Sequence, residues 1–377
     1  MKRILIFYSH FSPAFKAGGP VQSLANMVNE LNGCFEFYIF CGAREIGETS
    51  LLPGIKPDEW NAYTSNVQVY YASNGVARKV TSAIKKTNPD FIYVNGIFQP
   101  LYNSLPLWVA RNYNKKVIIA PRGMLQEGAL KIKPLKKKVF LSLLKTAGLF
   151  KGVIWHATDN QEAADIKKIA GSKTTVRLAT NVSKRYGDSI TPIKKLSGNL
   201  KLIYLSLIAE KKNLHLVLEA LLLLKTPIEF DIYGPIKDEP YWVRCQRLLN
   251  GQIHSIRYRG VVSPENVQVI LSGYHAFILP TKGENFGHAI YESLSVGVPV
   301  LVSQHTPWGD VRESTAGITI NTFSAKDWAD EIQEFVNLNQ EEYSMFSNGA
   351  HGLAKRYFSI NDFKAQYQSL FSDHLPT

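Results

Sequence analysis

Short apolar runs alternate with longer amphipathic stretches along the whole chain. In the first half, strand-like runs lie at residues 4–8, 35–40, 91–94 and 117–120, and stretches with helical periodicity lie at 21–31, 76–86 and 105–111. The second half repeats this alternation, with strand-like runs at 200–206, 228–233, 253–258, 276–279 and 300–302. Such a pattern predicts parallel sheets covered by helices on both faces. We therefore expect an α/β fold of two doubly wound, Rossmann-like domains.

The length of 377 residues exceeds that of one ordinary core, which also favours two domains. The segment that joins them is predicted at residues 183–199, which are polar, lack periodicity and contain Gly187, Asp188, Pro192 and Gly198. The predicted domains are residues 1–182 and 183–355, and residues 356–377 form a further segment in which 362–370 is predicted to be helical.

The cysteine and apolar content favours a cytoplasmic protein. Cys34, Cys41 and Cys245 stand far apart, without the spacing of a zinc site or a disulfide framework. The apolar run after Met1 ends at Ser9 without a cleavage site, so it predicts a first strand and no signal peptide. No stretch approaches the roughly 18 apolar residues of a membrane-spanning helix. We expect a cytoplasmic protein that is soluble or peripheral on the inner face of the membrane.

The net charge of +12 comes from the first half of the chain. Residues 1–182 hold 24 Lys and Arg against 11 Asp and Glu, whereas the remainder holds 19 against 20. The excess is densest in a basic segment that contains Lys131, Lys133, Lys136, Lys137, Lys138, Lys145 and Lys151, interleaved with Phe140, Leu141, Leu143 and Leu144. Interleaving of this kind is typical of a helix on an anionic membrane surface. A solvated basic helix is the alternative, and nucleic acid is not an expected partner because no reader module accompanies the charge.

The segment from Lys282 to Glu292 carries the most informative pattern. Glu284 precedes and Glu292 follows the start of a predicted helix, with the second carboxylate on the order of 8 Å further along the axis. Carboxylates accept paired hydroxyls of ribose or hexose, and the N–H groups of Asn285, Phe286 and Gly287 are placed to hold phosphate or hydroxyl oxygens. The pattern therefore favours a sugar-nucleotide site.

The run Glu-x-Phe-Gly-x-x-x-x-Glu, followed by the Gly297–Val300 turn into the next strand, closely resembles the signature of the GT-B glycosyltransferases of family 4. The resemblance is strongest from Lys201 to Gly317. It implies the GT-B fold, with two domains facing a central cleft, and a nucleoside-diphosphate sugar as donor. It also implies that Glu284 holds hydroxyls of the donor sugar, that Glu292 holds the ribose, and that the last helix, within 356–377, crosses back to the first domain.

A lysine pair follows the first strand of the second half. Lys212 matches the lysine of the family's R-x-x-x-x-K pair, where a cation meets the departing diphosphate. Leu207 occupies the arginine position, so the site lacks one expected cation, which Lys211, Lys282 or Arg122 would have to replace. The alternative is a solvated lysine pair at the start of a helix.

Other strand ends complete the predicted site. Gly18 and Gly19 follow the first strand and resemble the glycine loop that faces the donor diphosphate, with a tight structural turn as the alternative. Arg122 ends another strand and is placed to meet an anionic group, unless it holds backbone carbonyls of its own loop. The resemblance places the nucleotide base near Val261. His156 lies at a similar strand end, as a ligand or as a structural histidine.

No Asp-x-Asp run is present, and the few aspartates near the predicted site offer no cage for a divalent cation, so we expect neither a metal nor another cofactor. The sequence favours a retaining glycosyltransferase that moves a hexose to a glycan or lipid-linked acceptor. A role in lipopolysaccharide or other cell-surface polysaccharide assembly is implied by the resemblance. The alternatives are a GT-B sugar-nucleotide epimerase, and a noncatalytic anion- or lipid-binding scaffold with a decayed site.

Overall fold

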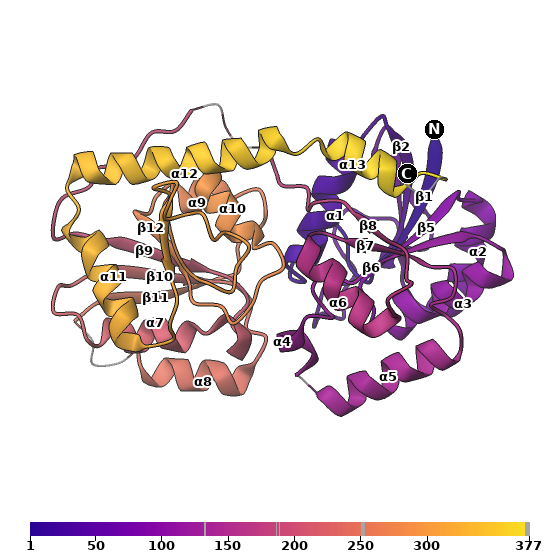
Figure 1. Ribbon diagram of the computed structural model, residues 1–377, viewed down its shortest axis with the longest axis horizontal. Helices are drawn as coiled ribbons and strands as arrows, with labels where there is room; N and C mark the ends of the chain where they lie inside the picture. Colours follow the sequence, from indigo (N-terminus) through magenta and orange to yellow (C-terminus); the bar gives the residue numbers. More distant parts are fainter. Residues whose placement is uncertain (132, 186, 188, 250–252, 374–377) are drawn as a thin grey trace. The chain divides into compact units, whose positions relative to one another are not determined.

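The computed structural model describes residues 1–131, 133–185, 187, 189–249 and 253–373. They form two compact units (Figure 1): residues 1–182 with the segment that begins at Asp362, and the segment Ser183–Asn361. Each unit has its own sheet with helices on both faces, so the predicted α/β fold with two doubly wound domains is confirmed. Asp188 of the predicted joining segment lies outside the described residues.

In the described residues, the N-terminal unit contains an eight-stranded sheet of order β3-β4-β2-β1-β5-β6-β7-β8. The strands are β1 (Lys2–Phe7), β2 (Phe35–Gly42), β3 (Trp60–Thr64), β4 (Val67–Ala72), β5 (Phe91–Asn95), β6 (Lys116–Ala120), β7 (Ile154–Ala157) and β8 (Val176–Leu178). Neighbouring strands are parallel except β3 and β4, which form an antiparallel hairpin at the edge. This hairpin was not predicted.

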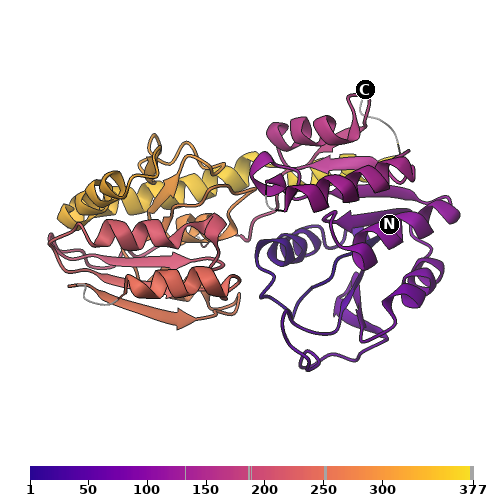
Figure 2. The ribbon, with the colours of Figure 1, turned by 90° about the horizontal axis from the view of Figure 1, so that it is seen from below.

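Helices cover both faces of this sheet (Figure 2). On one side are α1 (Gly19–Glu30) and α13 (Phe363–Leu370), and on the other are α2 (Val76–Thr87), α3 (Leu105–Asn112), α5 (Pro134–Thr146) and α6 (Asn160–Ala170). The short helices η1 (Pro100–Ser104) and α4 (Glu127–Leu130) lie in loops after β5 and β6. This arrangement follows from right-handed crossovers, which place helices on opposite faces when the strand order reverses between β1 and β5.

The C-terminal unit contains, in the described residues, a six-stranded parallel sheet of order β11-β10-β9-β12-β13-β14. The strands are β9 (Lys201–Leu205), β10 (Glu229–Tyr233), β11 (Ser255–Gly260), β12 (Ala276–Leu279), β13 (Val300–Ser303) and β14 (Gly317–Ile320). One face carries α7 (Leu214–Leu221), α8 (Glu239–Arg247) and α11 (Ala325–Asn337), and the other carries α9 (Val267–Leu271), α10 (His288–Ser295) and α12 (Gln340–Ile360).

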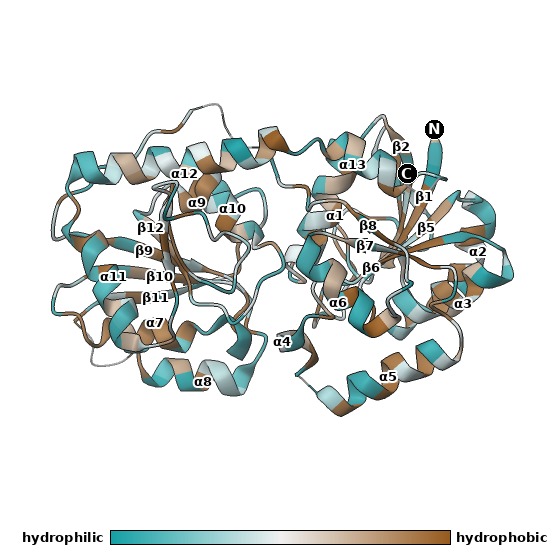
Figure 3. Cartoon of the chain, viewed as in Figure 1, coloured by the Kyte–Doolittle hydropathy of each residue, from teal (hydrophilic) through white to brown (hydrophobic). Residues whose placement is uncertain are grey.

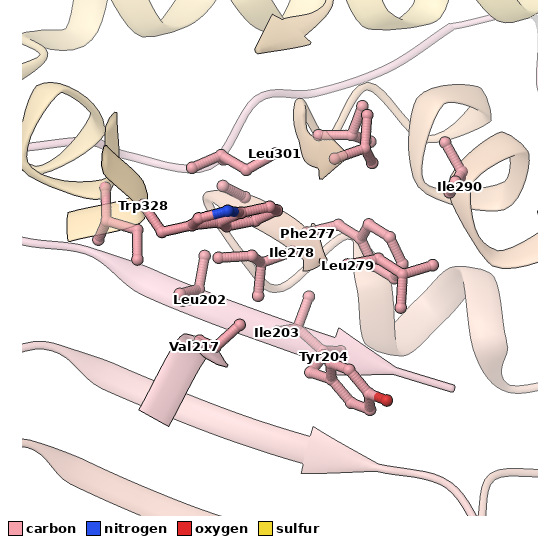
Figure 4. Packing of buried hydrophobic residues seen from close by; sticks show 14 of the residues in the cluster. Leu202, Ile203, Tyr204, Val217, Phe277, Ile278, Leu279, Ile290, Leu301 and Trp328 are labelled. Carbon is pink, nitrogen blue, oxygen red and sulfur yellow. The ribbon is translucent and has the colours of Figure 1, made fainter. Parts of the chain in front are cut away.

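The central strands of this unit are apolar at successive positions because helices bury both of their faces. Leu202, Ile203 and Tyr204 of β9 are all fully buried, as are Phe277 and Ile278 of β12. Figure 4 shows these side chains packed with residues of β13 and with the indole of α11. This core holds the carboxyl ends of β9 and β12 in fixed positions.

The chain returns to the N-terminal unit through its last two helices. α12 continues to Ile360, so the returning segment begins at Asp362, beyond the expected start at residue 356. Asp362 caps α13 by accepting a hydrogen bond from the N–H of Ala365 at 2.9 Å. At the other end of α13, Arg177 donates to the carbonyls of Leu370 and Ser372 at 2.8 and 2.9 Å. None of the helices in the described part of the chain is both long and apolar enough to cross a bilayer.

Candidate functional site

The two central strands of the C-terminal sheet, β9 and β12, are neighbours although they are distant in sequence. The chain proceeds outward from β9 through β10 to β11, and outward in the opposite direction from β12 through β13 to β14. Ligands of open α/β sheets bind outside the carboxyl ends of strands at such a reversal. The loop after β9 carries Lys212, and the loop after β12 carries Glu284.

Backbone contacts hold these two loops together. The N–H of Lys282 donates to the carbonyl of Lys211 at 2.8 Å, and the hydroxyl of Thr281 donates to the same carbonyl at 3.3 Å. The N–H of Glu284 donates at 2.9 Å to the carbonyl of His305, which follows β13. The loop that carries Glu284 is therefore anchored to the strand ends on both sides.

Lys212 and Glu284, which were assigned separate roles from the sequence, form an ion pair between Nζ and Oε1. Their side chains are only 16% and 13% exposed. Lys212 ends the short 3-10 turn Glu210–Lys212, and Asn213, with a left-handed φ of 58°, leads into α7. The structure thus brings two of the three predicted catalytic residues, which include Arg122, into direct contact.

Gly287 begins the helix that follows Glu284. Its φ of 79° is left-handed, and a Cβ at this position would lie 2.8 Å from Cδ1 of Ile290. Only glycine meets both conditions without strain. Its carbonyl accepts the N–H groups of Ile290 and Tyr291, so α10 begins at His288 with the amino end of the helix next to the Glu284 loop. This end favours anionic groups.

Phe286 is held from behind by an aromatic cluster. The indole Nε1–H of Trp308 donates to the carbonyl of Phe286 at 2.6 Å. The ring of Phe286 also lies 5.4 Å, between centroids, from the rings of both Trp308 and Tyr357. Phe286 is 7% exposed, so it fixes the shape of the loop through packing. Trp308 was missed from the sequence because it belongs to no motif. Asn285, between Glu284 and Phe286, remains a predicted donor-binding residue.

Glu292 lies in the second turn of α10, and its side chain is 7% exposed. In the described part of the chain, no hydrogen bond reaches its carboxylate. Burial raises the pKa of Glu292 to about 7, and the charge of Lys184 opposes this rise. A buried carboxylate that lacks hydrogen-bond donors is unfavourable, and ligand hydroxyls would satisfy it.

Lys184 was not predicted as a site residue, because it lies in a polar segment without a motif. Its charge acts on Glu292 and also on Glu265, whose pKa is lowered first by a hydrogen bond with Ser263 and further by Lys184. Glu265 belongs to the loop after β11, which begins with Val261, a residue that is 40% exposed. The loop predicted to meet the base and the carboxylate predicted to meet the ribose therefore lie near the same cation.

The loop after β9 carries Leu207 at the position of the family's arginine. Of the candidate replacements in this unit, Lys282 pairs with Glu210 at 3.5 Å. Lys211 instead lies over Gly283, where an added Cβ would be 3.7 Å from its Nζ. Lys211 and Lys282 thus both lie beside the Glu284 loop, and both stay predicted replacements for the arginine.

The remaining predicted residues belong to the N-terminal unit. Arg122 is buried and donates from Nε to Asn95 at 3.1 Å, from Nη1 to Asn181 at 2.6 Å and from Nη2 to the hydroxyl of Tyr93 at 2.8 Å. These acceptors are neutral and come from β5 and from the segment after β8. These contacts are to side chains of other segments and not to backbone carbonyls of its own loop, which was the alternative named from the sequence, and the catalytic role of Arg122 stays a prediction.

His156 belongs to the same buried network. Because the oxygen of Tyr93 accepts from Arg122, its O–H donates to Nδ1 of His156 at 2.8 Å, and Nε2–H donates to the carbonyl of Ala179 at 2.7 Å. Burial lowers the pKa of His156 to about 3, so the imidazole is neutral. The histidine therefore has a structural role.

Gly18 and Gly19 form the start of α1. Gly18 has a φ of 72°, which favours glycine, and its carbonyl accepts the N–H of Val21 at 3.0 Å. Gly19 is the first helical residue, and Pro20 lies in the first turn. This geometry is that of a helix start that follows a strand, and the role of the two glycines in donor binding stays a prediction. Within the described residues, no three His, Cys, Asp or Glu side chains gather where they would hold a metal ion.

Comparisons with known proteins agree with this geometry. The family model of the glycosyl transferases group 1 matches residues 189–352, which lie in the C-terminal unit. O-antigen chain mannosyltransferase B of Escherichia coli is 29% identical over 115 residues, which cover 29% of this chain and 30% of that protein.

Solved structures match over nearly the full length. A sucrose-phosphate synthase from Thermosynechococcus elongatus has a TM-score of 0.75 at 14% identity and covers 98% of both chains. HepE from Anabaena, in complex with UDP and glucose, has a TM-score of 0.73 at 14% identity, over 99% of this chain and 100% of HepE. The fold is that of the GT-B glycosyltransferases. Residues 189–352, somewhat less than half of the chain, match the family model of the glycosyl transferases group 1 domain.

Proposed function

We propose that this protein transfers a hexose from a nucleoside-diphosphate sugar to a glycan or lipid-linked acceptor, with retention of anomeric configuration. The observation that carries the proposal is the meeting of Lys212 and Glu284 outside the carboxyl ends of β9 and β12, next to the amino end of α10. The UDP and glucose bound to HepE, a protein of the same fold, support a donor of this kind.

Lys212 can exchange its ion pair with Glu284 for a contact with the donor diphosphate. In the proposed reaction the donor diphosphate draws Lys212 away from Glu284, whose carboxylate then accepts hydroxyls of the donor sugar. Lys212 and the amino end of α10 stabilise the negative charge that grows on the departing diphosphate. Because Glu284 serves as a hydrogen-bond acceptor and not as a nucleophile, the retaining transfer that we propose proceeds without a covalent sugar intermediate.

Glu292 and the loop after β11 complete the donor site in this proposal. The ribose hydroxyls satisfy the buried carboxylate of Glu292, and the base lies against the loop that begins at Val261. Lys211 supplies the cation that Leu207 does not. In the N-terminal unit, Gly18 and Gly19 keep their proposed role in donor binding.

The proposed acceptor belongs to cell-surface polysaccharide assembly on the cytoplasmic face of the membrane. The support is the 29% identity over 115 residues to O-antigen chain mannosyltransferase B, together with the basic first half of the chain. Acidic lipid-linked acceptors are attracted by such a charge.

A binding screen tests the donor site. We would measure thermal shifts of the protein with UDP, GDP, ADP and their sugar conjugates in the presence of EDTA. We expect stabilisation by one nucleotide and its sugar conjugate, lost in Glu292→Ala. Stabilisation that requires added metal would contradict metal-independent binding, and silence with every nucleotide would favour a noncatalytic scaffold.

Turnover of the donor so identified tests the catalytic assignment. Lys212→Ala and Glu284→Gln should each lower kcat by about 100-fold or more, because each removes a contact to the charge or hydroxyls of the reacting donor. Lys225→Ala, which changes an exposed lysine of the same unit, is the matched control. Unchanged turnover in Lys212→Ala or Glu284→Gln, with an intact melting transition, would remove that residue from the site.

A further inference from the structure

Helix α5 presents a different apolar face to solvent than the sequence suggested. Leu141 and Leu144 are 8% and 6% exposed and belong to the core, and the ring of Phe140 lies 5.8 Å from that of Phe98. Of the four apolar residues named from the sequence, only Leu143 is exposed, and Phe140 is half-buried. The correction follows from helical geometry, because residues 140, 141 and 144 share one side of a helix and residue 143 lies off it.

The outward side of α5 carries an apolar stripe made of Leu135, Val139 and Leu143. These side chains are 73%, 51% and 62% exposed. They are spaced by four residues, so they follow one another along one side of the helix over roughly 12 Å. Together with Lys136 and Phe140 they line a shallow surface groove whose lining is almost entirely apolar. Figure 3 shows α5 as a helix that mixes strongly hydrophobic and hydrophilic positions.

The stripe lies within the most basic part of the chain. Glu127 is the only acidic residue between Asp90 and Asp159, whereas the segment 131–151 holds seven lysines. Lys136, Lys138 and Lys145 are exposed, and no ion pair in the described part of the chain engages them. Lys137 is turned back instead, with Nζ on the carbonyl of Ala129 at 2.6 Å. The apolar stripe is thus flanked by cations without local counter-charges.

We propose that α5 docks on an anionic lipid bilayer, with Leu135, Val139 and Leu143 in the boundary between head groups and acyl chains and with the flanking lysines on the lipid head groups. The exposed lysines together with the apolar stripe favour a bilayer over other partners. A nucleic acid would match the lysines but offers no apolar layer for three large aliphatic side chains, and a second copy of this basic unit would place lysine against lysine. A helix at the interface of an anionic membrane uses both the lysines and the apolar stripe.

The docking surface goes beyond the proposed transfer reaction and uses none of its residues. It places the N-terminal unit against the surface where a lipid-linked acceptor would reside. Because α5 is separate from the donor-binding residues of the C-terminal unit, loss of membrane binding and loss of donor binding are measurable independently.

Vesicle sedimentation tests the proposal with the full-length protein. We expect binding to vesicles of equimolar phosphatidylcholine and phosphatidylglycerol, weaker binding at high salt, and little binding to phosphatidylcholine alone. The triple variant Leu135→Ser, Val139→Ser, Leu143→Ser should bind anionic vesicles more than about tenfold less tightly. Its matched control, Leu222→Ser with Leu223→Ser, replaces two exposed leucines of the C-terminal unit and should bind normally.

A second pair of variants separates the charges from the stripe. Lys136→Glu with Lys138→Glu should lose vesicle binding, whereas Lys85→Glu with Lys86→Glu, the same charge change on exposed positions of α2, should retain most of it. Every variant should keep the wild-type melting temperature and the thermal shift with the donor nucleotide.

Three results would overturn the proposal. Equal binding of the wild type and the stripe variant to anionic vesicles would show that α5 is not the docking surface. A dimer in light scattering that the stripe variant abolishes would assign the stripe to a second copy of the chain. Retention of a labelled RNA by the wild type, without vesicle binding, would assign the lysines to nucleic acid.

Discussion

Glu284 and Glu292, eight positions apart, are held in opposite ways. Glu284 is neutralised by Lys212, while Glu292 is buried on α10 without a hydrogen bond in the described part of the chain. In the absence of ligand, the negative charge of Glu284 is compensated by an ion pair, whereas a negative charge on Glu292 is disfavoured by burial. A donor that supplies hydroxyls to Glu292 would therefore relieve an unfavourable burial as it binds.

The burial of Glu292 predicts a pH-dependent gain in stability for Glu292→Gln. The ordinary pKa of the carboxyl is 4.5 and the folded value is about 7, so the folded state binds more protons between these values. The free energy of unfolding of the wild type therefore falls as pH rises from 4.5 to 7, by on the order of 3 kcal/mol. Glutamine has no carboxyl to titrate, so the free energy of unfolding of Glu292→Gln should not fall in this way between pH 4.5 and 7.

Urea unfolding of both proteins at acid pH and at about pH 8 measures the difference. The variant should match the wild type near pH 4.5 and exceed it above pH 7. Glu265→Gln, which removes an exposed carboxylate whose pKa is lowered, is the control and should gain nothing at high pH. A pH-independent difference for Glu292→Gln would mean that the carboxyl does not titrate on unfolding as described.

Single residues were predictable where a motif spaced them. The positions of Glu284, Glu292 and Lys212 in the C-terminal unit agree with their place in the pattern, since strand, loop and helix follow one another as the apolar run and Gly287 indicate. The ion pair of Lys212 with Glu284 was not predictable, because the two residues come from loops of strands that meet only in the folded sheet. Lys184 was likewise hidden in an irregular segment.

At the scale of the element, the start of α10 depends on Gly287. Gly287→Ala should destabilise the C-terminal unit by about 1–2 kcal/mol, because alanine disfavours a φ of 79° and its Cβ would overlap Cδ1 of Ile290. The same substitution in an Ile290→Val background, which lacks Cδ1, should cost less. Thermal or urea unfolding of the wild type, the two single variants and the double variant gives the coupling free energy between positions 287 and 290.

Gly309→Ala is the control for this cycle, since Gly309 has no positive φ and an added Cβ would meet open space. It should be nearly neutral. Equal costs of Gly287→Ala with isoleucine or valine at position 290 would attribute the whole effect to the backbone and none to the contact.

The faces of α5 show why an element's orientation is harder to predict than its presence. Apolar residues occur at positions 135, 139, 140, 141, 143 and 144, which leaves no single apolar side. The inward side is decided by partners distant in sequence, such as Phe98 for Phe140. The sequence therefore indicated a basic amphipathic helix, and only the packing showed which leucines are exposed.

At the scale of the whole molecule, the N-terminal unit is built from two separate stretches of chain. Arg177 joins them by donating to carbonyls at the end of α13. Arg177→Ala should lower the free energy needed to detach α13 from the rest of the N-terminal unit by about 2–3 kcal/mol, because charge-assisted hydrogen bonds to a buried helix end are lost. Limited proteolysis should then cleave near residues 361–373 faster than in the wild type.

Arg3→Ala is the control, because it removes an exposed arginine that pairs with Glu36 on the surface of the same unit. It should leave the cleavage rate unchanged. If Arg177→Ala also leaves it unchanged, the aromatic contacts of Phe371 with Phe35 and Phe91 suffice to hold the segment.

Two parallel sheets were predictable from the chain as a whole, because strands buried on both faces leave continuous apolar runs such as 276–279. In the hairpin of β3 and β4, Trp60–Thr64 has no buried residue and thus no strong apolar signal, whereas Val67–Ala72 alternates buried and half-buried residues and was overlooked. The helix predicted at 362–370 agrees with α13, but the bound of the returning segment was placed at residue 356, inside α12, because the helical pattern of α12 runs without a break across that residue.

The return of α13 brings the two ends of the described chain together: Lys2 Nζ lies 2.8 Å from the carboxylate of Asp373 and 2.9 Å from the carbonyl of Phe371. A circular permutant is therefore feasible, in which a short linker joins residue 373 to residue 1 and new termini open between 182 and 183. Such a chain would contain every part of the N-terminal unit as one uninterrupted stretch. The two units would then be joined by a single covalent connection, at 361–362, where the natural chain order has two.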